Sequence, residues 1–369
     1  MRIKPFKLER YFSKYEFSTK HLLSSSDCDG LSLEYVLSCA DPGERKLWNE
    51  LKLGYTESQG LPLLRESIAK QYKTITADQV LVLSPGEANF GFMNVLLAKG
   101  DHAICMTPMY QSLYQVAESI GCELTYWKPN EADWHYNPED LKRLIKPATK
   151  VLIVNFPHNP TGFLPSKEEV EAIVSIARQH NLIIYSDEMY HQLVPDQGAQ
   201  IPALCDLYEN AVSLWGMAKS FGLAGLRLGW IATRNTKILE EVMAYKDYLT
   251  ICNNAMSEML SLIAINHKEK FIPQNISKIK SNVDHFTKFQ AAHENVFDFV
   301  RPKGGSTAFI KLKTKESALD YSERLVKEAG VMLLPSEMFD YGSRFARIGF
   351  GRKNMPEALA AWEGFIRKN

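Results

Sequence analysis

The chain has 369 residues, of which 45% are hydrophobic, and its 43 basic and 43 acidic side chains give a formal net charge of zero. This length exceeds what one simple core needs, so we expect two domains, and the balanced charge argues against a dedicated nucleic-acid or membrane-surface binder. The first twenty residues carry charge throughout and no apolar run reaches membrane-spanning length, so we expect a soluble, cytoplasmic protein.

Short apolar runs alternate with helical patterns along the chain. A strand is predicted at Val80–Leu83, followed by a turn and a helix to about Ala98 that Gly100 ends. Further strands are predicted in HAICMTP, CELTYW, KVLIVNFP, NLIIYSDE and AVSLWG. SKEEVEAIVSIARQH has apolar residues at helical spacing after Ser166, a suitable N-cap. This alternation predicts an α/β protein with three layers, αβα, around a mainly parallel sheet.

Polar residues follow the predicted strands directly. In open α/β sheets, ligands bind beyond the carboxyl ends of the strands. Here the strand ends are followed, in chain order, by SPGEAN, TPMY, NFPHNPTG, SDEMY and WGMAK. These segments supply a glycine turn leading into a helix, an aromatic ring, an asparagine, an aspartate with a tyrosine three residues on, and a lysine.

The segment WGMAKSFGLAGLRLGW places a lysine and an arginine eight residues apart among several glycines. Gly222, Gly225 and Gly229 fit neither G-x-G-x-x-G nor G-x-x-x-x-G-K-[ST], so this is no standard nucleotide loop. The six cysteines form no C-x-x-C pair and the histidines show no H-E-x-x-H spacing, so we expect no metal site and no disulfide framework. GGSTA lacks the second glycine of a hydrolase elbow.

Together these groups are what a pyridoxal phosphate site needs. That cofactor requires a lysine to hold it covalently, a carboxylate at its ring nitrogen, donors for its ring oxygen, a flat side chain against its face and an anion site for its phosphate. The whole chain resembles the class I/II aminotransferases of the fold-type I pyridoxal phosphate-dependent superfamily. GMAKSFGLAGLRLG in particular resembles the lysine signature of the class I members. The resemblance implies pyridoxal 5'-phosphate as cofactor, the fold-type I architecture and a homodimer.

The resemblance also assigns roles to individual residues. Lys219 matches the lysine that binds the cofactor and acts in catalysis, and Arg227 matches the arginine that grips its phosphate. Asp187 matches the catalytic aspartate at the pyridine nitrogen. Tyr190 and Asn159 match the tyrosine and asparagine near the ring oxygen, and we count Tyr190 among the catalytic residues.

Four further positions complete the predicted cofactor site. Tyr110 is similar to the aromatic residue stacked on the ring. Gly86 and Glu87 occupy the turn whose backbone N–H groups meet the phosphate at a helix N-terminus, with the Glu87 side chain expected to point outward. Tyr55 resembles the tyrosine that reaches the phosphate in the partner subunit.

Substrate binding is predicted for Arg347, which resembles the arginine that binds the α-carboxylate, together with Asn159 and Ser25. The segment from Ser24 to Asp27 stands where the family's N-terminal segment folds over the substrate, and Ser306-Thr307 replaces residues that are bulky and apolar in many relatives. We expect both stretches to face the substrate, and so a polar or cationic substrate side chain.

Each of these residues also has an ordinary structural interpretation. A single lysine or arginine is usually a solvated surface charge, Asp187 alone would be a helix N-cap, Tyr110 a core residue, and Asn159-Pro160-Thr161-Gly162 a turn. The functional interpretation rests on their joint order, each at the end of a predicted strand. One position departs from the family pattern: Gly216 stands where many members place a serine that helps to hold the phosphate.

We predict a large cofactor-binding domain at residues 43–272 and a small α+β domain formed by residues 1–42 and 273–369. The predicted reaction is transamination between an amino acid and a 2-oxo acid. Another pyridoxal phosphate reaction remains an alternative, either β- or γ-elimination or a replacement with cyclisation as in capreomycidine synthase, because the lysine motif does not encode the outcome. A regulator that only senses ligands is disfavoured, since about forty residues before the large domain leave no room for a DNA-binding domain.

Overall fold

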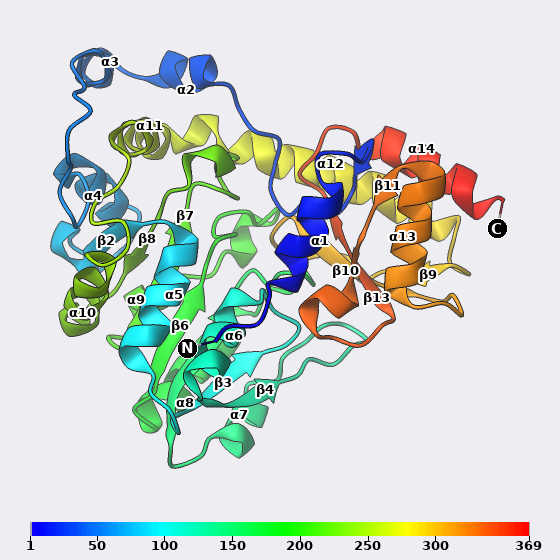
Figure 1. Cartoon of the computed structure of the whole chain (residues 1–369), viewed down its shortest axis with the longest axis horizontal. Coiled ribbons are helices and arrows are strands. Elements are labelled where there is room, and N and C mark those ends of the chain that lie inside the picture. Colours follow the sequence, from blue (N-terminus) through cyan, green and yellow to red (C-terminus); the bar gives the residue numbers. More distant parts are fainter. Residues whose placement is uncertain (1, 369) are drawn as a thin grey trace.

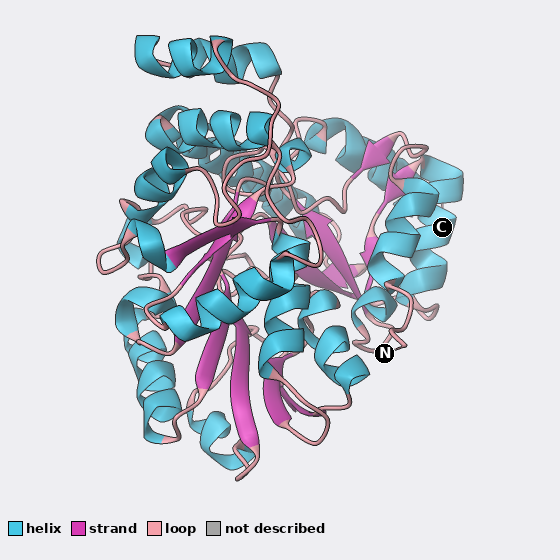
Figure 2. Ribbon diagram, turned by 60° about the vertical axis from the view of Figure 1, so that its left-hand side comes forward, coloured by secondary structure: helices cyan, strands magenta, loops and turns pink. Residues whose placement is uncertain are grey.

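The computed structural model describes residues 2–368 and contains a seven-stranded sheet, a four-stranded sheet and a two-stranded sheet (Figure 1, Figure 2). The larger sheet has seven strands in the order β2-β8-β7-β6-β5-β3-β4. Their bounds are β2 Val80–Leu83, β3 His102–Met106, β4 Glu123–Trp127, β5 Thr149–Asn155, β6 Ile183–Asp187, β7 Ala211–Gly216 and β8 Gly229–Ala232. Neighbouring strands are parallel except at β8, which runs antiparallel to both β2 and β7.

Helices cover both faces of this sheet, which gives the three-layer αβα arrangement of fold type I. Helix α5 (Pro85–Leu96) packs against α6 (Ser112–Ile120) and α10 (Thr236–Lys246), while α8 (Lys167–Gln179) packs against α7 (Glu139–Leu144) and α9 (Leu204–Leu207). The outer helices α4 (Pro62–Ala69) and α11 (Ala255–Asn266) contact each other. Most of these strands are almost fully buried, as their apolar runs predict, whereas the edge strand β4 is partly exposed.

The smaller part surrounds a four-stranded antiparallel sheet in the order β12-β13-β10-β9. Its strands are β9 Phe297–Asp298, β10 Thr307–Leu312, β12 Leu334–Pro335 and β13 Phe345–Gly349, and its helices are α12 Ile272–Ala291, α13 Ala318–Ala329 and α14 Met355–Ile366. The N-terminal segment joins this part, because β1 (His21–Leu22) pairs in parallel with β11 (Val331–Met332). Helix α1 (Lys7–Tyr15) lies in front of the smaller sheet in the view of Figure 1. Helices α2 (Leu33–Cys39) and α3 (Pro42–Asn49) lie at the upper left of the molecule in that view.

The α/β class, the mainly parallel sheet and the six predicted strands are confirmed. Ser166 caps α8 as predicted, with its Oγ accepting a hydrogen bond from the Glu169 N–H. The helix predicted to reach about Ala98 ends at Leu96 instead, because the Asp101 carboxylate accepts the Ala98 N–H and turns the chain. The domain boundaries at residues 43 and 272 stay a prediction. No helix of residues 2–368 has the length and apolar character needed to cross a membrane.

Candidate active site

A cavity of about 360 Å³ lies at the carboxyl ends of the parallel strands, between the two parts of the chain. Most of the residues predicted for the site line it together, although they come from distant points in the sequence. Those lining residues are Ser25, Gly86, Tyr110, Asn159, Asp187, Tyr190, Lys219, Arg227 and Arg347. Glu87 and Tyr55, also predicted for the site, are not among the residues that line the cavity.

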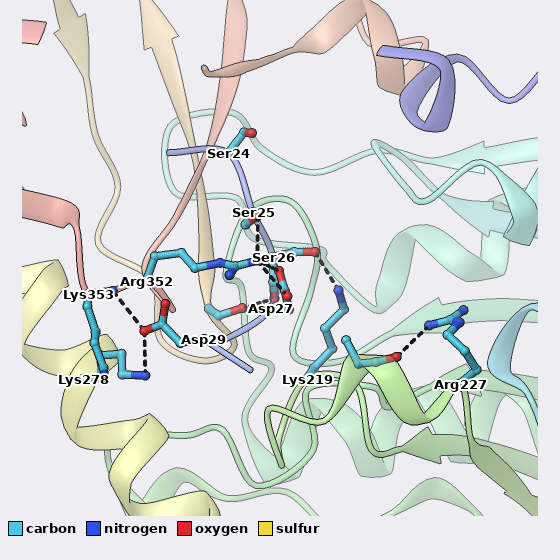
Figure 3. Close-up of polar contacts among 12 residues, drawn as sticks. Ser24, Ser25, Ser26, Asp27, Asp29, Lys219, Arg227, Lys278, Arg352 and Lys353 are labelled. Atoms are coloured by element: carbon cyan, nitrogen blue, oxygen red, sulfur yellow. Dashed lines mark hydrogen bonds and ion pairs between the residues drawn. The ribbon is translucent and has the colours of Figure 1, made fainter. Parts of the chain in front are cut away.

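Lys219 and Arg227 reach the same cavity because β7 and β8 are antiparallel neighbours. The segment between these strands leaves the end of β7 and enters β8 at the same edge of the sheet, so Lys219 and Arg227 both lie near that edge. Lys219 points toward the N-terminal segment, where its Nζ donates a hydrogen bond to Ser26 Oγ at 2.9 Å (Figure 3). Arg227 turns back in the left-handed conformation, and its Nη1 donates to the Ala224 carbonyl. The connection between β7 and β8, residues 217–228, therefore carries both Lys219 and Arg227.

Gly216 and Gly229 face each other across β7 and β8 and explain why no serine stands at position 216. A Cβ atom at Gly216 would lie 2.8 Å from the Gly229 Cα, and one at Gly229 would lie 2.7 Å from the Trp215 carbonyl oxygen. Cβ atoms in real structures essentially never approach other atoms that closely. A side chain at either position would therefore require the two strands to move apart.

Asp187 ends β6 and is 7% exposed. Its Oδ1 accepts the Met189 N–H at 3.0 Å in a turn, and no helix begins at Asp187, so the helix-cap interpretation is wrong. No lysine or arginine of the described residues pairs with it, and burial raises the pKa of its carboxyl to about 6. A buried carboxylate without a cation is suited to receive one from a ligand.

Asn159 and Arg347 are linked to Asp187 through the neighbouring strand. The Asn155 side chain donates to the Asp187 carbonyl and accepts the Asn159 N–H, both at 2.7 Å. The Asn159 Oδ1 in turn accepts a hydrogen bond from Arg347 Nη1 at 3.0 Å. Arg347 lies on β13, is 2% exposed and also donates from Nε and Nη2 to the Ser24 carbonyl. The guanidinium is therefore held in one orientation at the wall of the cavity.

The prediction that Ser306 and Thr307 face the substrate is wrong for this cavity, because neither residue lines it. Both are buried, and the Ser306 Oγ donates to the Ser26 carbonyl at 2.6 Å. Ser306 thus anchors the N-terminal segment through a hydrogen bond to its backbone. Ser25, Ser26 and Asp27 of that segment do line the cavity, as predicted.

The N-terminus of α5 forms another part of the cavity wall, through Pro85 and Gly86. Ser84 caps this helix by accepting the Glu87 N–H, and the Glu87 carboxylate points away to accept a hydrogen bond from Thr250. Within the described residues the Gly86 N–H donates to no other group, and a Cβ atom at Gly86 would meet nothing within 4 Å. Open space before a free helix N–H is suited to an anion.

Two of the predicted aromatic residues, Tyr190 and Tyr110, also line the cavity. Tyr190 is buried, and burial raises the pKa of its hydroxyl. Tyr110 donates a hydrogen bond from its hydroxyl to Glu9 Oε1 at 2.7 Å, and its ring packs against Phe6. Tyr55, by contrast, is 91% exposed in the single chain.

The residues present fit pyridoxal 5'-phosphate. Its ring nitrogen would meet the unpaired Asp187 carboxylate, and its ring oxygen the side-chain amide of Asn159, which donates to no described residue. Its phosphate would lie between Gly86 and Arg227. Burial lowers the pKa of Lys219, which favours the neutral amine that reacts with an aldehyde.

Two acidic residues of the cavity were not assigned from the sequence. Glu9 and Glu16 project into it from α1 and the residue after that helix, beside Leu8 and Phe12. Their spacing in KLERYFSKYE would have indicated a shared helix face, but the strand-end argument draws attention only to segments that follow strands.

Among the described residues, one group of side chains has the spacing of metal ligands. It consists of Asp41, Glu44 and His267 and lies apart from the cavity. Asp41 and Glu44 form the capping box of α3, and Glu44 also accepts a hydrogen bond from Asn266 and contacts His267. These carboxylates are already used in holding the helix end.

Comparison with known proteins identifies the relatives of this chain. The family model described as "Aminotransferase class I and II" matches residues 18–361. Capreomycidine synthase of Streptomyces vinaceus is 27% identical over 362 residues, covering 96% of this chain and 92% of that protein. An aspartate aminotransferase of Pyrococcus abyssi is 27% identical over 332 residues, covering 85% of this chain and 84% of that protein.

Solved structures are similar over the whole chain. A PLP-dependent aminotransferase from Streptococcus suis superimposes with a TM-score of 0.92 at 26% identity, covering 100% of this chain and 99% of that one. The PLP-dependent cyclase OrfR superimposes with a TM-score of 0.91 at 25% identity, covering 100% of this chain and 98% of that one.

Proposed function

The chain belongs to the class I and II aminotransferases, which are enzymes that depend on pyridoxal 5'-phosphate, and we propose that it transfers an amino group from an amino acid to a 2-oxo acid. One observation carries this proposal: Lys219, Asp187 and Arg347 line a single cavity. In the proposed roles, they are the proton carrier, the partner of the cofactor's ring nitrogen and the receptor of the substrate carboxylate.

The proposed chemistry needs one mobile proton carrier. When bound, the cofactor supplies the acceptor for the electron pair of the broken Cα–H bond and holds the amino group between the two half-reactions. Lys219 Nζ takes the α-proton and returns it, and its lowered pKa leaves more of the amine neutral for this task. Asp187, as an anion, keeps a proton on the ring nitrogen beside it.

Arg347 is arranged to read the α-carboxylate. Its guanidinium uses Nε, one Nη1 proton and one Nη2 proton on Ser24 and Asn159, which leaves one N–H on each terminal nitrogen. Two such donors match the two oxygens of a carboxylate. Because the guanidinium is already fixed, little side-chain entropy is lost when the substrate binds.

A homodimer is also part of the proposal. Tyr55 and Arg227 are both exposed in the single chain, and Leu53, Tyr55 and Tyr248 are large apolar side chains that face solvent. A partner subunit that covers this surface would bring its Tyr55 to the phosphate. Sedimentation at several concentrations tests the dimer, and Tyr55→Phe should weaken cofactor binding if the hydroxyl reaches the phosphate.

A second pyridoxal phosphate reaction remains a candidate, because a cyclase and an aminotransferase resemble this chain equally well in fold. Elimination, or replacement with cyclisation, would use the same lysine, carboxylate and arginine. The fold therefore does not choose between these reactions.

Single-turnover analysis separates them. The protein loaded with cofactor is mixed with one amino acid, without an acceptor, and the products are identified by mass spectrometry. Transamination gives equal amounts of pyridoxamine phosphate and the matching 2-oxo acid. Elimination gives ammonia and cyclisation gives a ring product, and both leave the cofactor as pyridoxal phosphate. If amino acids are consumed and none of them yields pyridoxamine phosphate, the proposal is refuted.

A further inference from the structure

One wall of the cavity is formed by a helix face that carries two carboxylates. Leu8, Glu9 and Phe12 of α1 and Glu16 directly after it all line the cavity. Spacings of three, four and seven residues place side chains on the same side of a helix. The wall therefore presents acidic, apolar and acidic groups in succession, with Phe12 between Glu9 and Glu16.

The cofactor and the α-carboxylate would use the other charges of the cavity. In the proposed function Lys219 is bound to the cofactor, Arg227 to its phosphate and Arg347 to the substrate carboxylate, while Asp187 holds the ring nitrogen. Asp27 is paired with Arg352, whose Nη2 lies 3.0 Å from its Oδ2 (Figure 3). Among residues 2–368 no cation forms an ion pair with Glu9 or Glu16, and the charges of Arg352 and Lys219 only partly offset the effect of burial on the pKa of Glu16.

The contacts of these two carboxylates agree with this account. Glu9 accepts a hydrogen bond from a neutral hydroxyl, that of Tyr110. Glu16 is half-buried, its backbone N–H donates to the Phe12 carbonyl, and its carboxylate forms no hydrogen bond or ion pair with the described residues. The pKa of Glu16 is raised, first by burial and then by the nearby charges of Asp27 and Glu9. Three carboxylates in one small space repel one another unless a cation joins them.

The cavity is a ligand site on grounds that do not involve these carboxylates. The Asn159 side chain lines it, is 6% exposed, and its amide nitrogen donates to no described residue. Asp187 lines it as well, and no lysine or arginine of the described residues forms an ion pair with it, although the charge of Lys219 acts on its pKa. The question left by Glu9 and Glu16 is therefore which ligand the site selects.

We propose that the substrate is an amino acid with a long cationic side chain, and that Glu16, assisted by Glu9, recognises its charge. This inference rests on the proposed function, since it takes Arg347 as the receptor of the α-carboxylate. The Arg347 guanidinium lies 5.8 Å from the centre of the Phe12 ring, so a side chain that leaves the bound Cα toward α1 passes along an apolar surface before it meets Glu16. Methylene groups ending in an ammonium or guanidinium suit that sequence of surfaces.

The test uses ligands that lack an α-amino group, and the cofactor absorbance is recorded to show that the terminal amine of 6-aminohexanoate has not reacted with the cofactor. The holoenzyme is titrated by calorimetry with 6-aminohexanoate, hexanoate and adipate, which share a carboxylate and a chain but end in a cation, a methyl group and an anion. We expect 6-aminohexanoate to bind about tenfold more tightly than hexanoate, since a partly buried ion pair is worth roughly that factor, and adipate to bind most weakly. Equal affinities for 6-aminohexanoate and hexanoate would overturn the proposal.

Variants assign the effect to its residue. Glu16→Gln should remove most of the preference for 6-aminohexanoate while leaving hexanoate binding unchanged, and Glu16→Lys should favour adipate. Glu171→Gln, an equal change of charge at an exposed site on α8, is the matched control and should alter none of the three affinities. A preference that survives Glu16→Gln and the double variant Glu9→Gln/Glu16→Gln would show that other groups select the ligand.

This outcome is independent of the reaction type. If pyridoxamine phosphate forms but the three ligands bind equally, the aminotransferase proposal stands and the cationic selectivity fails. If the ligands rank as expected but no pyridoxamine phosphate forms, the selectivity stands and another reaction on the same substrate class is indicated.

Discussion

Replacing Asp187 by asparagine should stabilise the protein from which the cofactor has been removed, although it damages the proposed reaction. The carboxylate is buried without a cation, so the apoprotein bears the cost of its desolvation. Asparagine keeps the shape and can still accept the Met189 N–H through Oδ1. The substitution therefore removes a buried charge and little else.

The size of the effect follows from the pKa. The ordinary carboxyl pKa is 3.8 and that of Asp187 in the folded chain is about 6, so the folded state holds its proton more tightly than the unfolded state. Each pH unit between the two values corresponds to about 1.4 kcal/mol, which gives about 3 kcal/mol. Because the pKa is raised on folding, the cost is absent below pH 4, grows as the pH rises toward 6 and is complete above it.

Urea unfolding of the apoprotein at pH 5 and pH 8 measures this. Asp187→Asn should be more stable than the natural sequence at both pH values, by about 3 kcal/mol at pH 8 and by roughly half of that at pH 5. With cofactor bound the ranking should reverse, because the ring nitrogen then loses its anionic partner and kcat falls. An apoprotein destabilised by the substitution at pH 8 would refute the reasoning and indicate that the Asp187 carboxylate mainly stabilises the turn through the Met189 N–H.

Three other substitutions test the site. Borohydride reduction should attach the cofactor to Lys219, as peptide mass spectrometry would show, and Lys219→Ala should bind cofactor only reversibly; an adduct on another lysine contradicts the assignment. Arg347→Lys should retain the cofactor but lower kcat/KM for amino acids by a factor on the order of ten to a thousand, whereas reaction with an amine lacking a carboxylate should change little. Gly216→Ser should destabilise the apoprotein by roughly 1–3 kcal/mol in urea unfolding, because its Cβ would collide with Gly229, and an unchanged midpoint would show that β7 and β8 can separate.

The sequence predicts the cofactor end of the site well because each of its groups follows a buried strand. Asp187 and Lys219 come after apolar runs that are easy to recognise, and parallel strands bring their ends together. Strand β8 was not predicted, since GWIA directly follows the glycine-rich turn and its place beside β7 depends on the close approach of Gly216 and Gly229. Local pattern does not reveal a contact of that kind.

The substrate end was harder to predict for a different reason. Ser306 was expected to face the substrate because many relatives have a bulky apolar residue at that position. Its hydroxyl instead donates a hydrogen bond to the Ser26 carbonyl. Glu9 and Glu16 reach the cavity only because Lys7–Tyr15 folds across it, held at Lys7 by an ion pair with Asp340 and at the other end by Lys14 with Glu323. These contacts span more than 300 residues, and no short motif encodes them.

The two ends of the cavity are therefore specified by different parts of the chain. The cofactor groups come from the strand ends of the seven-stranded sheet, whereas Arg347 and the carboxylates of α1 come from the smaller part and the N-terminal segment. We expect substitution of Glu16 to change the choice of substrate more than cofactor binding, whereas Glu9 and Ser26 bond directly to Tyr110 and Lys219 of the proposed cofactor site. Asn159 is the exception, because its Oδ1 holds Arg347 while its N–H is tied through Asn155 to Asp187. A change at Asn159 should alter cofactor and substrate binding together, since the same side chain positions both.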